Sequence, residues 1–354
     1  MSETSILNST RNTPFPCLSV NEVSGGIANA TYRGKLDTTL QDGTDSVIIK
    51  HAEKELDKMP ELSMSTTRCN TEQSLFCALQ NTPICELQHG PVTIKCPDVY
   101  HYLNQENTEI IQDLPHDSTL HAWLTNPTIK HNEETLMASG EALGSWLARF
   151  HALSKEGIES SLADVVERNS DSSNSDLAAV KLQSVERQCK DEKVRRYVKD
   201  ILFQRPQNSR VMVHGDFSTR NILFQAPSSS TSDQHNLCSM AIVDWEVCCY
   251  DDFTRDVGNV LADLYMQHLF TGLDEPLTVF KSFVSAYSAL SEEEVYRTVT
   301  HIGENCFHWI AYAPKDPPKE IFDKIVRLGE ELVIMGMEGD REGIERTFFG
   351  CLFR

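Results

Sequence analysis

The chain of 354 residues lacks any hydrophobic run of about 18 residues, so no segment of the sequence is expected to span a bilayer as a helix. The N-terminal segment, MSETSILNSTRNTPFPC, contains no apolar stretch of secretory length and a single Arg, so we expect neither a signal peptide nor a transit peptide. These absences predict a cytoplasmic protein without a membrane partner.

Basic residues are scarce, because 32 Lys and Arg stand against 52 Asp and Glu, for a formal net charge of −20. Nucleic-acid phosphates and anionic lipid headgroups repel such a chain, so we expect neither as a partner, and a protonated amine is the ligand that the charge favours. The 11 Cys residues are irregularly spaced and form no CxxC pair. Reduced thiols are therefore expected, rather than a disulfide framework or a zinc site.

Short apolar segments broken by Gly, Pro and Asn fill the first part of the chain. They predict an antiparallel sheet with strands at 18–23, 30–35, 47–50, 99–103 and 109–112. One helix over 67–79 interrupts the sheet, because Leu75 and Leu79 stand four apart and neither Gly nor Pro occurs in this range.

Beyond residue 115 the hydrophobic period becomes helical. One face of a long helix is formed by Leu136, Leu143, Leu147 and Phe150. Residues 156–176 are rich in Ser, Asp and Asn and predict an exposed loop, whereas 178–203 predicts one or two helices. Ser291 and Glu294 form a capping box at the start of a further helix.

The strongest chemical signal is the segment HGDFSTRN at 214–221, followed by DWE at 244–246. Asp216, then Asn221, then Asp244 after the next strand match the layout with which kinases handle a nucleoside triphosphate and its metal ions. Phosphoryl transfer requires Mg²⁺ held by oxygen ligands and a hydroxyl placed in line with the γ-phosphorus. We therefore expect Asp216 to act as the catalytic base, with Asn221 and Asp244 as the Mg²⁺ ligands.

Two upstream features stand in the order found in kinases. Gly25 and Gly26 join two predicted strands, where glycines let backbone N–H groups approach a phosphate. Lys50 ends a strand, where its ammonium can neutralise the α- and β-phosphates, and Glu72 on the next helix can fix it by an ion pair. Singly, such features are more often a plain hairpin or a solvated charge. Together they predict an α+β, two-lobed protein-kinase-like fold that binds ATP and Mg²⁺.

With these motifs the sequence resembles the aminoglycoside phosphotransferase and choline kinase-like family. The blocks that carry the resemblance are GGIANATYR, VIIK, IIQDLP, LGSWLARFH, HGDFSTRN and DWEVCCYDDFTRDVGNVLADLY. It looks most like the fungal small-molecule kinase branch, such as hydroxytryptamine kinase, and more distantly like methylthioribose kinase. The resemblance implies an ATP-dependent transfer of phosphate to a hydroxyl of a small molecule in secondary metabolism.

The resemblance also implies roles for residues and a division of the chain. Besides the base and the metal ligands, it gives a phosphate-binding turn, a phosphate-positioning pair and an adenine-binding hinge: Gly25, Gly26 and Asn29; Lys50 and Glu72; Gln112, Asp113 and Leu114. Asp256 corresponds to a structural aspartate near the catalytic loop. Residues 1–112 would form the nucleotide-binding lobe, 113–115 the hinge between lobes, and 116–354 the catalytic and acceptor-binding lobe.

Departures from the family pattern bear on the acceptor. Arg220 stands where relatives carry a small residue, and the usual exposure of Arg favours solvent over contact with phosphate or substrate. Asp251 and Asp252 replace a Gly-Pro pair, and their charge near the cleft favours a cationic acceptor. The aromatic cluster from Phe307 to Tyr312 is either core or a wall around the acceptor's amine. Composition does not indicate an oligomeric state.

Other functions compete with a small-molecule kinase. A protein kinase is disfavoured, because HGD and DWE replace HRD and DFG and no APE segment follows. A kinase-fold binding or regulatory protein without turnover would be expected to lose the catalytic and metal-binding residues, which are all present. A metal-dependent phosphohydrolase needs neither the hinge nor Lys50. If the protein is a small-molecule kinase, a thio-sugar such as methylthioribose is the alternative acceptor.

Overall fold

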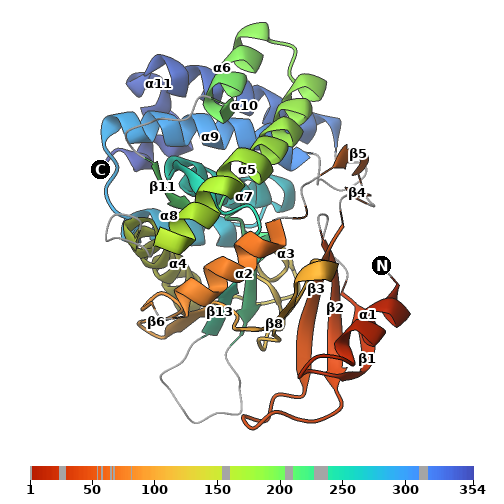
Figure 1. Ribbon diagram of the computed structural model, residues 1–354. Coiled ribbons are helices and arrows are strands. Elements are labelled where there is room, and N and C mark those ends of the chain that lie inside the picture. Colours follow the sequence, from red (N-terminus) through yellow and green to blue (C-terminus); the bar gives the residue numbers. More distant parts are fainter. Residues whose placement is uncertain are drawn as a thin grey trace.

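An antiparallel five-stranded sheet forms the N-terminal part of the molecule, at the lower right of Figure 1. The structure is a computed structural model. It describes residues 2–23, 29–53, 55–56, 59–63, 66, 68–80, 82–153, 160–203, 210–226, 238–310 and 318–354. The strand order is β1-β2-β3-β9-β8. Their bounds are Cys17–Glu22 (β1), Asn29–Leu36 (β2), Ser46–Ala52 (β3), Val99–Leu103 (β8) and Thr108–Gln112 (β9).

The central strand β3 determines where the sheet presents charge. It pairs with β2 and β9, so that Lys50 lies opposite Thr31 on one side and Glu109 on the other. Its apolar residues Val47 and Ile49 are fully buried, together with residues of the N-terminal helix α1 (Glu3–Thr10). Packing of these apolar residues therefore holds the Lys50 backbone in the middle of a sheet.

A second five-stranded sheet joins segments from both parts of the chain. Its order is β10-β12-β13-β7-β6, and β13 pairs with β7 in parallel. The bounds are Glu86–His89 (β6), Val92–Lys95 (β7), Ser118–Thr119 (β10), Ile222–Gln225 (β12) and Cys238–Ile242 (β13). The hairpin of β6 and β7 was not among the predicted strands. It joins this sheet because Val92 and Ile94 are fully buried in the core that also contains Ile242.

Helices dominate the rest of the chain and gather at the top and left of Figure 1. Their bounds are Arg68–Leu79 (α2), Leu120–Thr125 (α3), Glu133–Leu153 (α4), Ser160–Gln188 (α5), Glu192–Phe203 (α6), Thr254–Thr271 (α7), Glu275–Ala286 (α8), Glu292–Ile310 (α9), Lys319–Glu338 (α10) and Arg341–Glu345 (α11). The remaining elements are the strand pairs β4 (Glu55–Leu56) with β5 (Met59–Ser63) and β11 (Arg210–Val213) with β14 (Cys249–Asp252), and three 3₁₀ turns at Asn104–Glu106, Thr219–Asn221 and Phe348–Leu352. The α+β class, with an N-terminal antiparallel sheet and a larger helical part, is confirmed.

Local sequence signals succeed at helix α9 and fail at helix α5. The capping box at the start of α9 is formed, since the Ser291 N–H donates to Glu294 Oε2 at 2.7 Å. The exposed loop expected over 156–176 is wrong from residue 160 onward, where helix α5 begins. Asn169 on α5 is buried and donates to the carbonyls of Glu246 and Cys248. These long-range contacts override the loop-forming composition.

The long helix α4 supplies the centre of the core. The Trp146 ring stacks on Phe150 and Phe217 at centroid distances of 5.6 and 5.9 Å. On its other side α4 approaches α8 through glycine: a Cβ at Gly144 would lie 2.5 Å from the Phe283 carbonyl oxygen. Close backbone contact therefore fixes α4 against α8. Among the described helices, none has the length and apolar character needed to cross a membrane.

Replacing Gly144 with Ala should lower the free energy of unfolding by about 1–3 kcal/mol, because the added methyl group forces α4 and α8 apart. Urea denaturation followed by tryptophan fluorescence measures this change. Arg149→Ala, an exposed position on the same helix, is the control and should change the free energy by less than about 0.5 kcal/mol. A Gly144→Ala protein as stable as the parent would contradict the close contact.

Candidate functional site

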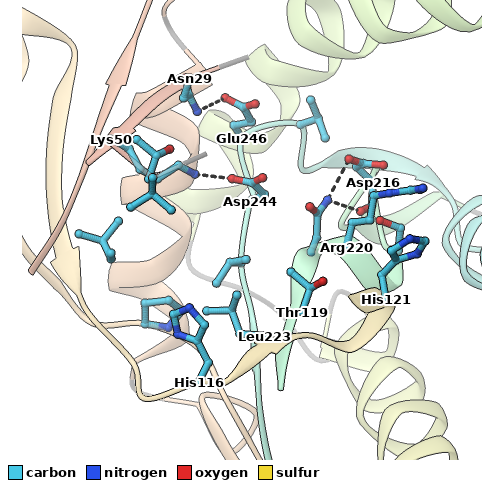
Figure 2. A pocket seen from close by; sticks show the side chains of 18 of the residues that line it. Asn29, Lys50, His116, Thr119, His121, Asp216, Arg220, Leu223, Asp244 and Glu246 are labelled. Carbon is cyan, nitrogen blue, oxygen red and sulfur yellow. Dashed lines mark hydrogen bonds and ion pairs between the residues drawn. The ribbon is translucent and has the colours of Figure 1, made fainter. Parts of the chain in front are cut away.

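A cleft of about 990 Å³ is lined by residues of the N-terminal sheet and of the helical part. Figure 2 shows Lys50 and Asp244 on one side of this cleft and Asp216 and Arg220 on the other. Apart from Glu72 and the two glycines, every predicted site residue lines it. Gly25 and Gly26 lie outside the described residues.

Lys50 is the centre of a buried ion-pair cluster. Its Nζ lies 2.8 and 2.6 Å from the two carboxylate oxygens of Glu72 and 2.7 Å from Asp244 Oδ1. The side chains of Lys50 and Glu72 are 5% and 0% exposed, whereas that of Asp244 is 42% exposed. Burial opposes the charge on Lys50, but the carboxylates of Asp244 and Glu72 outweigh it and raise the pKa of Lys50 well above its ordinary value. The ammonium therefore stays charged.

Asp244 lies at the turn after β13 in a strained conformation. Its φ of 65° is in the left-handed region, which non-glycine residues adopt only where their surroundings enforce it. Burial favours the neutral acid, yet the nearby Lys50 ammonium holds the pKa of Asp244 below its ordinary value. The Val243 N–H donates to the Asn221 carbonyl at 3.0 Å, which brings this turn next to the segment HGDFSTRN.

Asp216 and Asn221 are in direct contact. Asn221 Nδ2 donates to the Asp216 backbone oxygen and to Asp216 Oδ2, both at 2.9 Å. Because the amide nitrogen faces Asp216, its oxygen Oδ1 is the atom of Asn221 suited to a metal ion. Among the described residues, no group of three or more His, Cys, Asp or Glu could hold a metal. A metal here would take its protein ligands from Asn221 and Asp244 and the remainder from a ligand such as phosphate.

Asp256 anchors the loop that carries Asp216. It accepts hydrogen bonds from the backbone N–H groups of His214 at 2.7 Å and Gly215 at 2.9 Å, and contacts His151 Nε2 at 3.1 Å. Burial alone would raise the pKa of Asp256, but the hydrogen bond from His151 and the other donors bring it below the ordinary value. Gly215 is required here, because its φ is 86° and a Cβ would lie 2.6 Å from the Val247 carbonyl oxygen.

A second ion pair, which the sequence analysis missed, ties Asn29 into the site. Glu246 Oε2 accepts from Asn29 Nδ2 at 2.7 Å and from Arg68 Nε at 2.9 Å. Arg68 Nη2 also donates to Asn29 Oδ1 at 3.2 Å. Glu246 stands in the DWE motif two residues after Asp244, so its position was a usable signal. Arg68 gave none, since a buried Arg at a helix start looks like an exposed one in the sequence.

The predicted hinge residues Gln112, Asp113 and Leu114 line the cleft. Asp113 accepts hydrogen bonds from Arg33 Nε at 2.7 Å and from Ser46 Oγ at 2.7 Å, so its side chain is bound by residues of the N-terminal sheet. The Leu114 carbonyl accepts from His116 Nδ1 at 2.7 Å. Apolar residues from both parts of the molecule also line the cleft: Val23, Ile48, Ile111, Leu223 and Val243.

Arg220 does not point into solvent, so the favoured expectation for it is wrong. Its guanidinium lies 5.0 Å from the centre of the Trp309 ring, and its Nη1 is 3.6 Å from Asp263 Oδ1. Trp309 Nε1 donates to the same Asp263 oxygen at 2.7 Å. The buried charge of Asp263 holds the guanidinium against the wall of the cleft, where the Arg220 side chain is 33% exposed.

The aromatic cluster divides between cleft and core. Trp309 and His308 line the cleft, whereas Phe307 is buried in a hydrophobic cluster with Val185. Burial lowers the pKa of His308 to about 3, and the nearby cations Lys181 and Arg220 lower it in the same direction. This wall therefore presents a neutral histidine. Tyr312 lies outside the described residues.

Asp251 and Asp252 do not add charge to the cleft, contrary to expectation. Asp251 Oδ2 pairs with Arg255 at 2.9 Å, and Asp252 Oδ2 pairs with Arg297 at 2.7 Å. Both carboxylates belong to β14, and neither lines the cleft. Because both carboxylates are paired with arginines outside the cleft lining, they do not favour a cationic acceptor.

The chain is similar to known phosphotransferases and kinases. The family model described as phosphotransferase enzyme family matches residues 87–291. The phosphotransferase FrzJ of Cladobotryum sp is 30% identical over 362 residues, which cover 96% of this chain and 93% of that relative. The 4-hydroxytryptamine kinase of Psilocybe cubensis is 25% identical over 289 residues, covering 79% of this chain and 77% of the relative.

A solved structure shares the fold at low sequence identity. The amicoumacin kinase hAmiN, in complex with AMP-PNP, Ca²⁺ and its ligand, superposes with a TM-score of 0.52 at 15% identity. The alignment covers 99% of this chain and 97% of that structure. The protein-kinase-like arrangement expected from the sequence is thereby confirmed.

Replacing Asp256 with Asn should lower the free energy of unfolding at pH 7 by about 2–3 kcal/mol, because the amide cannot accept both buried N–H groups. The Asp256 carboxylate stabilises the fold above its ordinary pKa of 3.8, and this contribution disappears as the pH falls through the lower folded-state pKa. The difference between parent and variant should therefore persist from pH 7 to about pH 4.5 and shrink below it.

Urea denaturation across this pH range measures the Asp256→Asn difference. Asp274→Asn, whose carboxylate is 87% exposed, is the control and should leave the free energy nearly unchanged. A difference between parent and Asp256→Asn that grows on acidification would contradict the role of Asp256 as a charged anchor.

Proposed function

Since the chain belongs to the phosphotransferase enzyme family and is a small-molecule kinase, we propose that it transfers the γ-phosphate of ATP to a hydroxyl of an amine-bearing metabolite. The observation that carries this proposal is the bridge from Lys50 to Glu72 and Asp244 at the edge of a cleft that also contains Asp216 and Asn221. A cation, two oxygen donors for a metal and a carboxylate base are the groups that phosphoryl transfer needs.

The nucleotide would lie along the sheet side of the cleft. The base would lie beside Gln112 and Leu114, and Lys50 would meet the α- and β-phosphates. Asn29, held by Glu246 and Arg68, would lie near the phosphates. The complex of amicoumacin kinase with AMP-PNP supports a nucleotide in this fold. We propose that 1–112, 113–115 and 116–354 act as nucleotide lobe, hinge and catalytic lobe.

The residues present fit a divalent metal. Asn221 offers its amide oxygen and Asp244 a half-exposed carboxylate, and both are oxygen ligands of the kind that Mg²⁺ prefers. When bound, Mg²⁺ neutralises charge on the phosphate oxygens and orients them. The Ca²⁺ in the amicoumacin kinase structure supports a divalent ion in this family.

Asp216 would accept the proton of the acceptor hydroxyl. The hydrogen bond from Asn221 Nδ2 orients its carboxylate, and Asp256 holds the backbone before it. A carboxylate so placed binds the hydroxyl in the reactive direction and removes its proton as the new oxygen–phosphorus bond forms. The adjoining wall, with Arg220 lying on Trp309, would bound the acceptor.

An amine on the acceptor is favoured by the charges at the cleft and by the relatives. Six carboxylates line the described cleft, and four of them, Asp113, Asp244, Glu246 and Asp263, form ion pairs with Arg33, Lys50, Arg68 and Arg220. The other two are Asp117 and Asp216, so the charge that would attract an amine lies on these carboxylates. The named substrate of two curated relatives, 4-hydroxytryptamine, is an amine. A protonated amine is attracted to such a surface more than a neutral sugar.

Replacing Asp216 with Asn should lower kcat by about 10²–10⁴ while changing the Kd for Mg·ATP by less than about two-fold, because the base is lost and the nucleotide contacts remain. Steady-state kinetics and calorimetric titration with Mg·ATP measure these quantities. Asp323→Asn, at an exposed carboxylate, is the matched control. Unchanged turnover in Asp216→Asn would remove this residue from the mechanism.

A panel of acceptors tests the substrate class. ATP consumption should be measured with amino-alcohols, hydroxyindole amines, aminoglycosides and thio-sugars, each amine being paired with its N-acetyl derivative. We expect kcat/KM to be at least about tenfold higher for the free amine, because acetylation removes the charge that the carboxylates attract. Turnover of thio-sugars alone would contradict the proposed amine-bearing acceptor, but it would still agree with a small-molecule kinase.

A further inference from the structure

A buried lysine that the proposed mechanism does not use lies behind the acceptor end of the cleft. Lys181 on α5 is 1% exposed. Its ammonium lies 3.2 Å from Asn259 Oδ1, 3.0 Å from Asn305 Oδ1 and 3.3 Å from Glu304 Oε2. Because an ammonium has three N–H donors, these three acceptors, from α7 and α9, match its full capacity.

The ammonium is held in a site that disfavours charge. Burial lowers the pKa of Lys181 from its ordinary value of 10.5, and Glu304 opposes this effect. Glu304 is itself fully buried. A buried pair of this kind adds little stability compared with an apolar pair of the same size, so stability alone does not account for it.

Lys181 is one of the groups that fix the orientation of two amide side chains that line the cleft. Since an ammonium only donates hydrogen bonds, the oxygens of Asn259 and Asn305 must face it and their nitrogens must face away. Asn305 Nδ2 then donates to Asn259 Oδ1 at 2.6 Å and to the His301 carbonyl at 2.8 Å. Asn259 Nδ2 is left facing the Gly215 carbonyl, at 3.4 Å.

Gly215 immediately precedes Asp216, so this contact reaches the base. The Gly215 N–H is held by Asp256 at 2.9 Å, and its carbonyl faces the Asn259 amide. The residue is thus held from both sides. Asp216 also lies within electrostatic reach of the Lys181 ammonium.

The same helix contributes to the cleft surface. Leu177 lies four residues and Val180 one residue before Lys181, and both line the cleft, as does Asn259. Helix α5 therefore contributes apolar side chains to the cleft and a buried charge beside them. Through Asn259, this charge connects α5 with the residue before Asp216.

We infer that Lys181 is a positioning residue: by fixing the amide of Asn259 it holds the Gly215 carbonyl and with it the direction of the Asp216 carboxylate. This inference rests on the proposed function for the role of Asp216. Without the ammonium, the Asn259 oxygen keeps only the donor from Asn305, so the Asn259 amide is held less firmly against the Gly215 carbonyl. The backbone before Asp216 would then shift.

The test replaces both members of the buried pair. Lys181→Met alone leaves Glu304 as an unpaired buried charge and risks unfolding, so the variant is Lys181→Met with Glu304→Gln, which keeps the volume and removes both charges. We expect kcat to fall by about 10–100-fold with the KM for ATP within about two-fold, since a misdirected base affects the chemical step.

The matched control is Val185→Ala on the same helix. Val185 is fully buried in the cluster around Phe307, so its truncation loosens α5 without removing the ammonium. It should lower Tm by a few degrees and leave kcat per folded molecule within about two-fold of the parent. Equal losses of kcat in the control and the double variant would reduce Lys181 to a structural role and overturn the inference.

Hydrogen exchange gives a readout that needs no acceptor. The peptide containing Gly215 and Asp216 should exchange at least about tenfold faster in the double variant and at the parent rate in Val185→Ala. Unchanged exchange, or a folded double variant with the parent's kcat, would overturn the inference. A parent protein that neither binds Mg·ATP nor transfers phosphate would instead refute the proposed function, while the exchange rates would still decide whether Lys181 holds the loop.

Discussion

The structure depends on one buried ammonium. Lys50 is brought into the protein by a strand that also carries the buried apolar residues Val47 and Ile49, and once buried it requires negative partners from elsewhere in the chain. Glu72 of α2 and Asp244 after β13 supply them. Because removing one partner of a buried ion pair costs about 3–5 kcal/mol, this cation fixes three elements that are remote in sequence relative to one another. The geometry of the cleft follows from that constraint.

Buried charged groups that join separate elements also hold other residues of the site. Glu246 joins Arg68 and Asn29, and Asp256 receives the two N–H groups before Asp216. Each anchor is a buried carboxylate that collects donors from separate elements. The left-handed backbone of Asp244, which costs about 1–3 kcal/mol, persists because its side chain belongs to such a cluster. Strain and buried charge are concentrated where the chemistry needs fixed directions.

The parts of the site that sequence could predict are those whose geometry is local. Asp216 and Asn221 meet because a tight turn joins them, and Lys50 faces Glu72 because a sheet with one covering helix leaves few alternatives. Residues whose environment is set by remote partners were misjudged. Arg220 lies on Trp309, which is far along the chain. Helix α5 has the composition of a loop and forms through contacts such as those of Asn169. The hydrophobic period and the spacing of motifs do not predict which residues, distant in the sequence, will contact these side chains.

The carboxylates in and near the cleft show why net charge alone does not predict which ligand the cleft attracts. Asp251 and Asp252 are neutralised by arginines away from the cleft, and Asp263 is neutralised by Arg220 within it. What an incoming molecule meets is therefore the charge left over after these internal pairings. Asp216 accepts an uncharged amide donor from Asn221 and lines the cleft. An attraction for a protonated amine must act through carboxylates of this kind, close to the reacting hydroxyl, rather than through the field of the whole chain.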